Sequence, residues 1–261
     1  MILRTHNLSK HFGGVVALDD VSVEFHPGSV TALVGSNGAG KSTLFSAMTG
    51  LLVPDRGEVE LGDDRGGIRL TGLPPHVVAR HGVGILFQDA RVFGKLTALE
   101  NVAVGAPSQP GERPLRSLFR RAGAAARDRE VMELARQHLA FVGLAGKGHV
   151  WAEHLSYGEQ KLVAIARLLA ADARVLLLDE PTSGVHADRA GALSELVRQL
   201  ADDHDRTVVM IEHNYDVVAR VSDRVYRMDA GRVTASGSPR EVLNSGRQGG
   251  ACRVAQFGST T

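Results

Sequence analysis

The sequence has a single cysteine, almost no excess of charge of either sign and no long apolar run. The lone Cys252 excludes an internal disulfide and any metal site built from cysteines. Thirty basic residues stand against 29 acidic ones, so the net charge of +1 creates no global field that favours nucleic acid. Apolar runs such as residues 175–178 are far too short to cross a bilayer. We therefore expect no nucleic-acid partner, and any link to a membrane through another protein.

The composition is typical of a protein that folds in water. Hydrophobic residues make up 43% of the chain and charged residues 23%. Residues 1–10 lack the apolar core of a signal peptide, so we expect a cytoplasmic protein. A length of 261 residues allows either a single α/β domain or two domains.

Short apolar segments alternate with segments of helical character. Residues 30–34 predict a buried strand, which leads through a loop of small residues into a helix over 42–48. Two more buried strands are expected at 174–178 and 207–211, with a helix over 189–200 between them. This alternation predicts a mainly parallel sheet that is covered on both faces.

The middle of the chain differs from its ends. A stretch rich in Pro, Gly and Arg at 107–121 predicts an exposed loop, and a helix is expected over 124–142. Its apolar face consists of Val131, Leu134, Ala135, Leu139 and Val142. A short helix is expected at 240–243, and the mostly polar tail beyond it is expected to be mobile.

A glycine-rich motif directly follows the strand expected at 30–34. It fits the phosphate-loop pattern in every specified position and in the required strand-to-helix context. Glycines let successive amide hydrogens face the phosphates, and the helix adds the positive end of its dipole. We expect Lys41 to reach the β- and γ-phosphates and Ser42 to bind Mg²⁺. The candidate nucleotide contacts here are Gly35, Ser36, Asn37, Gly38, Ala39, Gly40, Lys41, Ser42 and Thr43.

Two carboxylates end the buried strand expected at 174–178. Asp179 and Glu180 follow it directly, and charged groups at the carboxyl end of a strand commonly face a ligand crevice. Asp179 is placed to hold Mg²⁺ through water, and Glu180 to accept a proton from the attacking water. Together with the phosphate loop, this pair fits many nucleotide hydrolases.

The hexapeptide Leu-Ser-Tyr-Gly-Glu-Gln at 155–160 lies a short distance before these carboxylates. It resembles the signature motif of ATP-binding cassette (ABC) proteins, which addresses the γ-phosphate held by a second cassette. The resemblance assigns Ser156, Gly158 and Glu159 to nucleotide binding. An ordinary helix cap at Ser156 explains the serine but not the order of the motifs. A helix over 159–170 is predicted independently by the apolar face of Leu162, Ile165, Ala166 and Leu169.

Further residues match the ABC family in the same order along the chain. Phe12 resembles the aromatic residue that stacks on adenine, and His213 resembles the switch histidine that contacts the γ-phosphate. Gln88 resembles the glutamine that touches Mg²⁺ or its water and senses the membrane partner. Taken alone, each would more often be structural or solvated. The catalytic group implied is Glu180, His213 and Gln88, and the Mg²⁺ ligands implied are Ser42, Gln88 and Asp179.

The resemblance implies an α/β, P-loop NTPase fold of ABC type, with a mainly parallel core sheet, an antiparallel β subdomain and a helical insert. It covers about residues 1–243 as one ATPase domain with an insert at about 95–170, and leaves 244–261 as a flexible tail. It further implies MgATP hydrolysis in a head-to-tail dimer with a second ABC ATPase subunit, which is a homodimer or a heterodimer. Permease subunits would hold this dimer at the inner face of the cell membrane.

Within the family, residues 8–14 and 212–214 and the long segment from Gln88 to Leu155 look most like importers of branched-chain amino acids. We expect import of branched-chain or other hydrophobic amino acids, with a periplasmic or extracellular solute-binding protein in the system. A urea or amide importer, a lipopolysaccharide exporter and a non-transport cassette remain alternatives. His186 stands where many cassettes have an acidic residue at the dimer interface, and it is either a coupling group or a solvated loop histidine.

Val92 and Phe93 are apolar in a segment that otherwise predicts an exposed loop. Exposed apolar patches commonly mark interfaces. We expect the surface beside Gln88, including Arg91, to bind a helix of a membrane subunit. The alternative is that Phe93 belongs to the core of its own domain.

Overall fold

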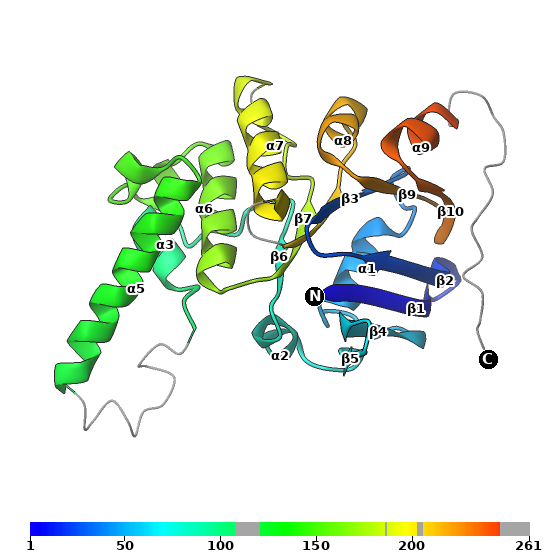
Figure 1. Ribbon diagram of the computed structural model, residues 1–261, viewed down its shortest axis with the longest axis horizontal. Helices are drawn as coiled ribbons and strands as arrows, with labels where there is room; N and C mark the ends of the chain where they lie inside the picture. Colours follow the sequence, from blue (N-terminus) through cyan, green and yellow to red (C-terminus); the bar gives the residue numbers. More distant parts are fainter. Residues whose placement is uncertain (108–120, 186, 203–205, 246–261) are drawn as a thin grey trace. The chain divides into compact units, whose positions relative to one another are not determined.

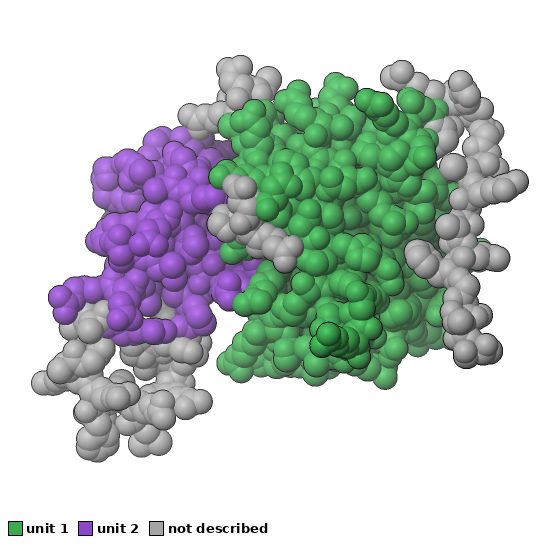
Figure 2. All heavy atoms as spheres, viewed as in Figure 1, with its two compact units in different colours: residues 1–85, 174–182, 190–261 green, residues 86–173, 183–189 purple. Residues whose placement is uncertain are grey.

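The computed structural model describes residues 1–107, 121–185, 187–202 and 206–245 (Figure 1). Most of the loop predicted at 107–121, all but the first residues of the predicted tail, and His186 lie outside these residues. The chain divides into two compact units (Figure 2). The first comprises residues 1–85, 174–182 and 190–261, and the second comprises residues 86–173 and 183–189. The extent of the single domain at 1–243, with its insert at about 95–170, stays a prediction.

A six-stranded sheet has the order β10-β9-β3-β8-β7-β6. Strand β3 pairs in parallel with both β8 and β9, β7 pairs in parallel with β8, and β10 pairs antiparallel with β9. The mainly parallel sheet is thereby confirmed. Its strands are β3 (Ser29–Val34), β6 (Val83–Leu86), β7 (Val175–Asp179), β8 (Thr207–Ile211), β9 (Arg224–Asp229) and β10 (Arg232–Gly237).

The central strands form where the sequence is mostly apolar. Every residue of β8 is buried, as are the last five of β3 and the first four of β7. Continuous burial is typical of parallel strands that are covered on both faces. The strands predicted at 30–34, 174–178 and 207–211 are confirmed within one residue.

A second sheet of four strands is antiparallel throughout, in the order β2-β1-β4-β5. Its strands are β1 (Ile2–Phe12), β2 (Val15–Phe25), β4 (Arg56–Asp63) and β5 (Gly66–Arg69). Inward residues of this sheet, such as Leu3 and Val59, share one buried cluster with Leu44 of helix α1 (Lys41–Met48) and Leu177 of β7. The helix after the phosphate loop is therefore fixed by apolar packing against both sheets.

The described residues form four more helices around these sheets. They are α2 (Pro75–Arg80), α7 (Ala187–Asp202), α8 (Tyr215–Val221) and α9 (Pro239–Ser245). The helices predicted at 42–48, 189–200 and 240–243 are present, with ends that differ by one or two residues. Within the described residues, no helix has the length and apolar character needed to span a bilayer.

In the described part of the second unit, three helices contact one another, α3 (Ala98–Ala103), α5 (Arg121–Phe141) and α6 (Tyr157–Ala170). Single turns at Ala145–Lys147 and Ala152–His154 link α5 to α6. The predicted apolar face of α5 is confirmed in part, because Ala135, Leu139 and Val142 are buried whereas Val131 and Leu134 are partly buried. For α6, the predicted apolar face does not match the set of buried residues. Leu162 is only partly buried, whereas Lys161, Val163 and Ala164 are buried, since α3 and α5 both pack on this helix.

Candidate nucleotide site

The phosphate loop connects β3 to α1 and closes around the side chain of Lys41. Its ammonium donates hydrogen bonds of 2.8 Å to the backbone oxygens of Gly35 and Ser36. Lys41 is buried at the start of α1, whereas Ser42, the next residue, is exposed. The loop therefore presents a cation and a free helix start at the same place, an arrangement that suits bound phosphates.

Two glycines of the loop have no room for a side chain. Gly40, at the start of α1, has a φ of 101°, and a Cβ there would lie 2.4 Å from the carbonyl oxygen of Ala17. A Cβ on Gly35 would lie 2.2 Å from the carbonyl oxygen of Met228. Only glycine allows the backbone to turn this closely against β2 and β9.

The carboxylates predicted at the end of β7 lie close enough to Lys41 to act on its charge. Burial lowers the pKa of the Lys41 ammonium, and the negative charges of Glu180 and Asp179 oppose that shift. The phosphate loop and the carboxyl end of β7 thus meet at one site, as parallel strands with a shared edge require. The structure brings together Lys41, Asp179 and Glu180 from separate parts of the sequence.

Glu180 also pairs with His213. The Nε2 atom of His213 lies 3.1 Å from Oε1 of Glu180. The neighbouring strands β7 and β8 cause this contact, because Asp179 pairs with Ile211 and the next residues leave the sheet side by side. Glu180 has a φ of 48°, and its amide donates to the carbonyl oxygen of Ile211 at 3.0 Å. The carboxylate is therefore held by a histidine at the edge of the phosphate site.

Sequence reasoning missed Glu212, which holds the turn that carries His213. Its buried carboxylate accepts hydrogen bonds from the hydroxyl of Thr182 at 2.9 Å and from the amides of His213 and Asn214 at 3.3 Å each. Asn214 in turn caps α8. The signal was present, because Glu212 follows a run of four apolar residues, 208–211, as Asp179 follows residues 175–178. Glu212 ties the end of β8 to the segment after Glu180.

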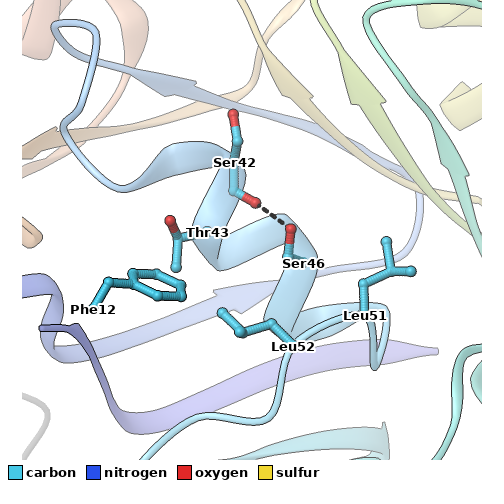
Figure 3. Close-up of a pocket in the computed structure, with 6 residues that line it drawn as sticks. All are labelled: Phe12, Ser42, Thr43, Ser46, Leu51 and Leu52. Carbon is cyan, nitrogen blue, oxygen red and sulfur yellow. Dashed lines mark hydrogen bonds between the residues drawn. The ribbon is translucent and has the colours of Figure 1, made fainter.

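The aromatic ring of Phe12 is half exposed and lies beside α1, which excludes a purely core role. Figure 3 shows it on one side of a pocket, with the residues of α1 and of the segment after it on the other. The hydroxyl of Ser46 donates to the carbonyl oxygen of Ser42 at 2.8 Å. The pocket is lined by Phe12, Ser42, Thr43, Ser46, Leu51 and Leu52.

Asp55, also missed at the sequence level, fixes the strand that carries Phe12. Its carboxylate accepts from the ammonium of Lys10 at 2.8 Å and from the amide of His11 at 2.7 Å. These bonds lower the pKa of Asp55 to about 2, with the Lys10 bond the largest cause. The amide of Asp55 donates to Ser9 at 2.8 Å. The end of β1 is thereby held against the segment that follows α1.

In the second unit, Ser156 caps α6. Its Oγ accepts from the amide of Glu159 at 3.4 Å, and the Glu159 carboxylate accepts from the amide of Ser156 at 3.1 Å. Lys147 adds a 2.7 Å ion pair to the buried Glu159 side chain. Ser156 is therefore a helix cap, and it also stands in the order of motifs on which the family resemblance rests. Because the Glu159 carboxylate turns back to this cap, any contact of Glu159 with nucleotide stays a prediction.

Gln88 and the apolar residues after it also lie in the second unit. Gln88 is exposed, and its backbone carbonyl accepts a hydrogen bond from the hydroxyl of Tyr157. Phe93 has 51% of its surface exposed, so the alternative that it is a core residue is wrong. The guanidinium of Arg167 lies 5.5 Å from the ring of Phe93, and that of Arg91 lies 3.7 Å from the ring of Phe87. The surface beside Gln88 therefore has exposed aromatic and cationic character.

The sequence profile of the ABC transporter family matches residues 18–183, a span that holds the phosphate loop, the signature segment, Asp179 and Glu180. The chain belongs to the ABC transporter family. It is thus the ATP-binding and ATP-hydrolysing subunit of an ABC transporter, and the family resemblance of the signature segment is confirmed.

Relatives and solved structures agree with this assignment. The chain is 34% identical to the high-affinity branched-chain amino acid transport ATP-binding protein LivG of Escherichia coli, over 94% of each chain. It is similar to the ADP conformation of MJ1267, an ATP-binding cassette of an ABC transporter. That comparison gives 35% identity and a TM-score of 0.79 over 94% of this chain and 93% of the other. The P-loop fold of ABC type is confirmed, and the cassette binds adenine nucleotide.

A third similar protein is described as a dimer. It is the post-hydrolysis state of the ATP-binding cassette MJ0796 bound to ADP and Pi. The identity is 26% and the TM-score 0.74, over 91% of this chain and 99% of the other. A cassette similar to this chain is therefore known as a dimer.

Proposed function

We propose that this ABC ATPase powers the import of branched-chain or other hydrophobic amino acids through membrane permease subunits. The observation that carries the proposal is the similarity to LivG along nearly the whole of both chains. The cassette would lie at the cytoplasmic face of the membrane, held there by the permeases, and a periplasmic or extracellular solute-binding protein would deliver the solute. Residues 1–243 would act as one ATPase domain.

The solute is tested by uptake in the source cells. Deletion of the gene for this chain is expected to abolish high-affinity uptake of labelled leucine, isoleucine or valine, and the intact gene is expected to restore it. Loss of urea or amide uptake with normal amino-acid uptake would select the alternative importer. A defect confined to lipopolysaccharide on the cell surface would select an exporter.

Most of the groups that would bind the nucleotide belong to the first unit. Adenine would stack on Phe12, and Lys41 would leave the loop carbonyls to reach the β- and γ-phosphates. The hydroxyl of Ser42 and the carboxylate of Asp179 are oxygen donors of the kind that Mg²⁺ prefers, so these residues fit the ion. Gln88 would contribute an amide oxygen. When bound, Mg²⁺ would neutralise charge on the phosphates.

Hydrolysis would follow a single in-line displacement. Glu180 would accept a proton from water while the water oxygen bonds to the γ-phosphorus and the bond to the ADP oxygen breaks. His213, 3.1 Å from Glu180, would orient that carboxylate and contact the γ-phosphate. The products are ADP and inorganic phosphate, with no covalent enzyme intermediate. Catalysis would come from positioning and charge stabilisation.

A second cassette would complete each site. In a head-to-tail dimer, the start of α6 at Ser156 and Gly158 would face the γ-phosphate held by the partner. The positive end of the helix dipole favours such an anion. The partner is a second copy of this chain or another cassette of the same transporter. The dimeric arrangement described for MJ0796 supports this proposal.

Replacing Phe12 with alanine is expected to weaken ATP binding roughly tenfold, because loss of one base–aromatic stack costs about 1–3 kcal/mol. Phe12→Tyr keeps the ring and is the matched control, with affinity near that of the parent. Titration with ATP and with inorganic triphosphate separates the cause, since triphosphate has no base. An equal loss of affinity for both ligands would show that Phe12 shapes the site without stacking on adenine.

Replacing Phe93 with aspartate is expected to weaken coupling to the permease while basal ATPase activity stays intact. The reason is that Phe93 is 51% exposed beside Arg167, and we propose that this surface binds a helix of a membrane subunit. Leucine uptake by cells that carry Phe93→Asp should fall, whereas Phe93→Leu should retain most uptake. Unchanged uptake in the aspartate variant would remove Phe93 from the docking surface.

A further inference from the structure

Lys161 is a fully buried lysine in the middle of the signature helix α6, with 0% of its surface exposed. Removing an ammonium from water costs several kcal/mol, and a hydrocarbon chain of the same length would fill the space without that cost. The position therefore uses a polar group where packing alone would favour an apolar one. Its nitrogen donates to the backbone oxygen of Ser183 at 2.8 Å and lies 4.9 Å from the ring of Tyr157.

Tyr157, one turn earlier on the same helix, joins two more segments to this lysine. Its hydroxyl donates to the backbone carbonyl of Gln88. Its ring packs against Gly184, where a φ of 70° and a Cβ that would lie 3.0 Å from the ring leave room for glycine alone. The side chain of Val185 packs beside Gly158, because a Cβ on Gly158 would lie 3.3 Å from the Val185 side chain. Through Tyr157 and Lys161, helix α6 therefore contacts both the Gln88 segment and residues 183–185.

We infer that Tyr157 and Lys161 are positioning residues that couple the start of the signature helix to the Gln88 segment and to the segment after Glu180. The inference rests on the proposed function, in which Ser156 and Gly158 face the partner's nucleotide. Ser183 follows Glu180 by three positions, so the Lys161 bond fixes the chain that leaves the proposed general base. A shift of about 1 Å in such a group can lower a rate by as much as a hundredfold.

The pair would transmit the state of one site to the other. Nucleotide of the partner cassette acts on the start of α6, and the same turn of helix holds the segments that position Gln88 and Glu180 in its own cassette. Tyr157 and Lys161 contact Gln88, Ser183 and Gly184, which lie outside the phosphate loop. Their loss should therefore lower kcat and leave the affinity of the phosphate loop for nucleotide unchanged.

The test compares Lys161→Met, Tyr157→Phe and the double variant with the parent protein. Lys161→Met removes the bond to Ser183 and keeps the length of the side chain. Tyr157→Phe removes the hydroxyl that donates to Gln88 and keeps the ring against Gly184. We expect kcat for ATP to fall roughly tenfold in each single variant, with the Kd for ADP and the Tm near parent values. Because both bonds support the same part of the second unit, kcat of the double variant should fall by less than the product of the two single decreases.

The control is Lys95→Met, a lysine of the same unit whose side chain is 87% exposed and pairs with Glu153 at 3.0 Å. It should match the parent in kcat. Parent-like kcat in both Lys161→Met and Tyr157→Phe would overturn the inference. If Lys161→Met lowers the Tm by many degrees, Tyr157→Phe decides alone. A parent protein without ATPase activity would instead contradict the proposed function, so the two failures are distinguishable.

Discussion

Replacing Glu180 with glutamine should lower ATP turnover by at least about a hundredfold while ATP remains bound, because glutamine cannot accept the proton of the attacking water. The geometry supports this role. Glu180 leaves β7 beside the phosphate loop, its charge acts on Lys41, and His213 holds it at 3.1 Å. Phosphate release measures turnover, and titration with ATP measures binding.

Glu195→Gln is the matched control for this substitution, because Glu195 is an exposed glutamate of α7 in the same compact unit. Its turnover should equal that of the parent. Near-parent turnover in Glu180→Gln would show that another group accepts the proton. Loss of ATP binding together with turnover would instead place Glu180 in the structure of the binding site.

Replacing Lys41 with alanine should abolish tight nucleotide binding. Its ammonium is the cation that the phosphate loop closes around, with two hydrogen bonds of 2.8 Å to loop carbonyls. On binding, the phosphates would replace those carbonyls and pair with a full positive charge in a partly dry site. Removal of the charge should therefore weaken binding of ATP far more than loss of one ordinary hydrogen bond does.

Calorimetric titration with ATP measures this effect, and Lys95→Ala controls for the loss of a lysine at an exposed position. The Tm of Lys41→Ala shows whether the loop still folds. A folded Lys41→Ala protein with parent affinity for ATP would mean that the phosphates bind elsewhere.

Local signals in the sequence predicted the nucleotide-binding half of the fold. Strands β3, β7 and β8 are short runs of mostly apolar, buried residues, and each is followed by a loop with polar or small residues. No residue other than glycine fits at positions 35 and 40, since backbone oxygens lie where a side chain would be. Such positions carry strong signals because a single local requirement decides them.

Contacts between distant segments could not be predicted from one sequence. The antiparallel sheet was expected only from the family resemblance, because β1 and β2 pair with several register shifts that disturb the alternation of apolar residues. Asp55 lies 44 positions from His11, and nothing in its own neighbourhood points to that bond. The burial of Lys161 could not be predicted either, since a lysine on a helix is expected at the surface.

The assignment of roles depended on the order of motifs. Glu180 and His213 are 33 positions apart, and only the parallel pairing of β7 with β8 places them in contact. Leu162 shows the opposite case, in which periodicity alone predicted burial of a residue that is only partly buried, because α6 packs on two helices.

The mass in solution of the Glu180→Gln protein, measured by light scattering after size exclusion, shows whether two cassettes pair around ATP. The protein is measured alone and mixed with the transporter's second cassette, with MgATP, with MgADP and without nucleotide. We predict a dimer with MgATP, at about twice the 27.8 kDa of one chain when two copies pair, and a monomer in the other two conditions. A mass of 27.8 kDa with saturating MgATP, both alone and in the mixture, would contradict the paired sites.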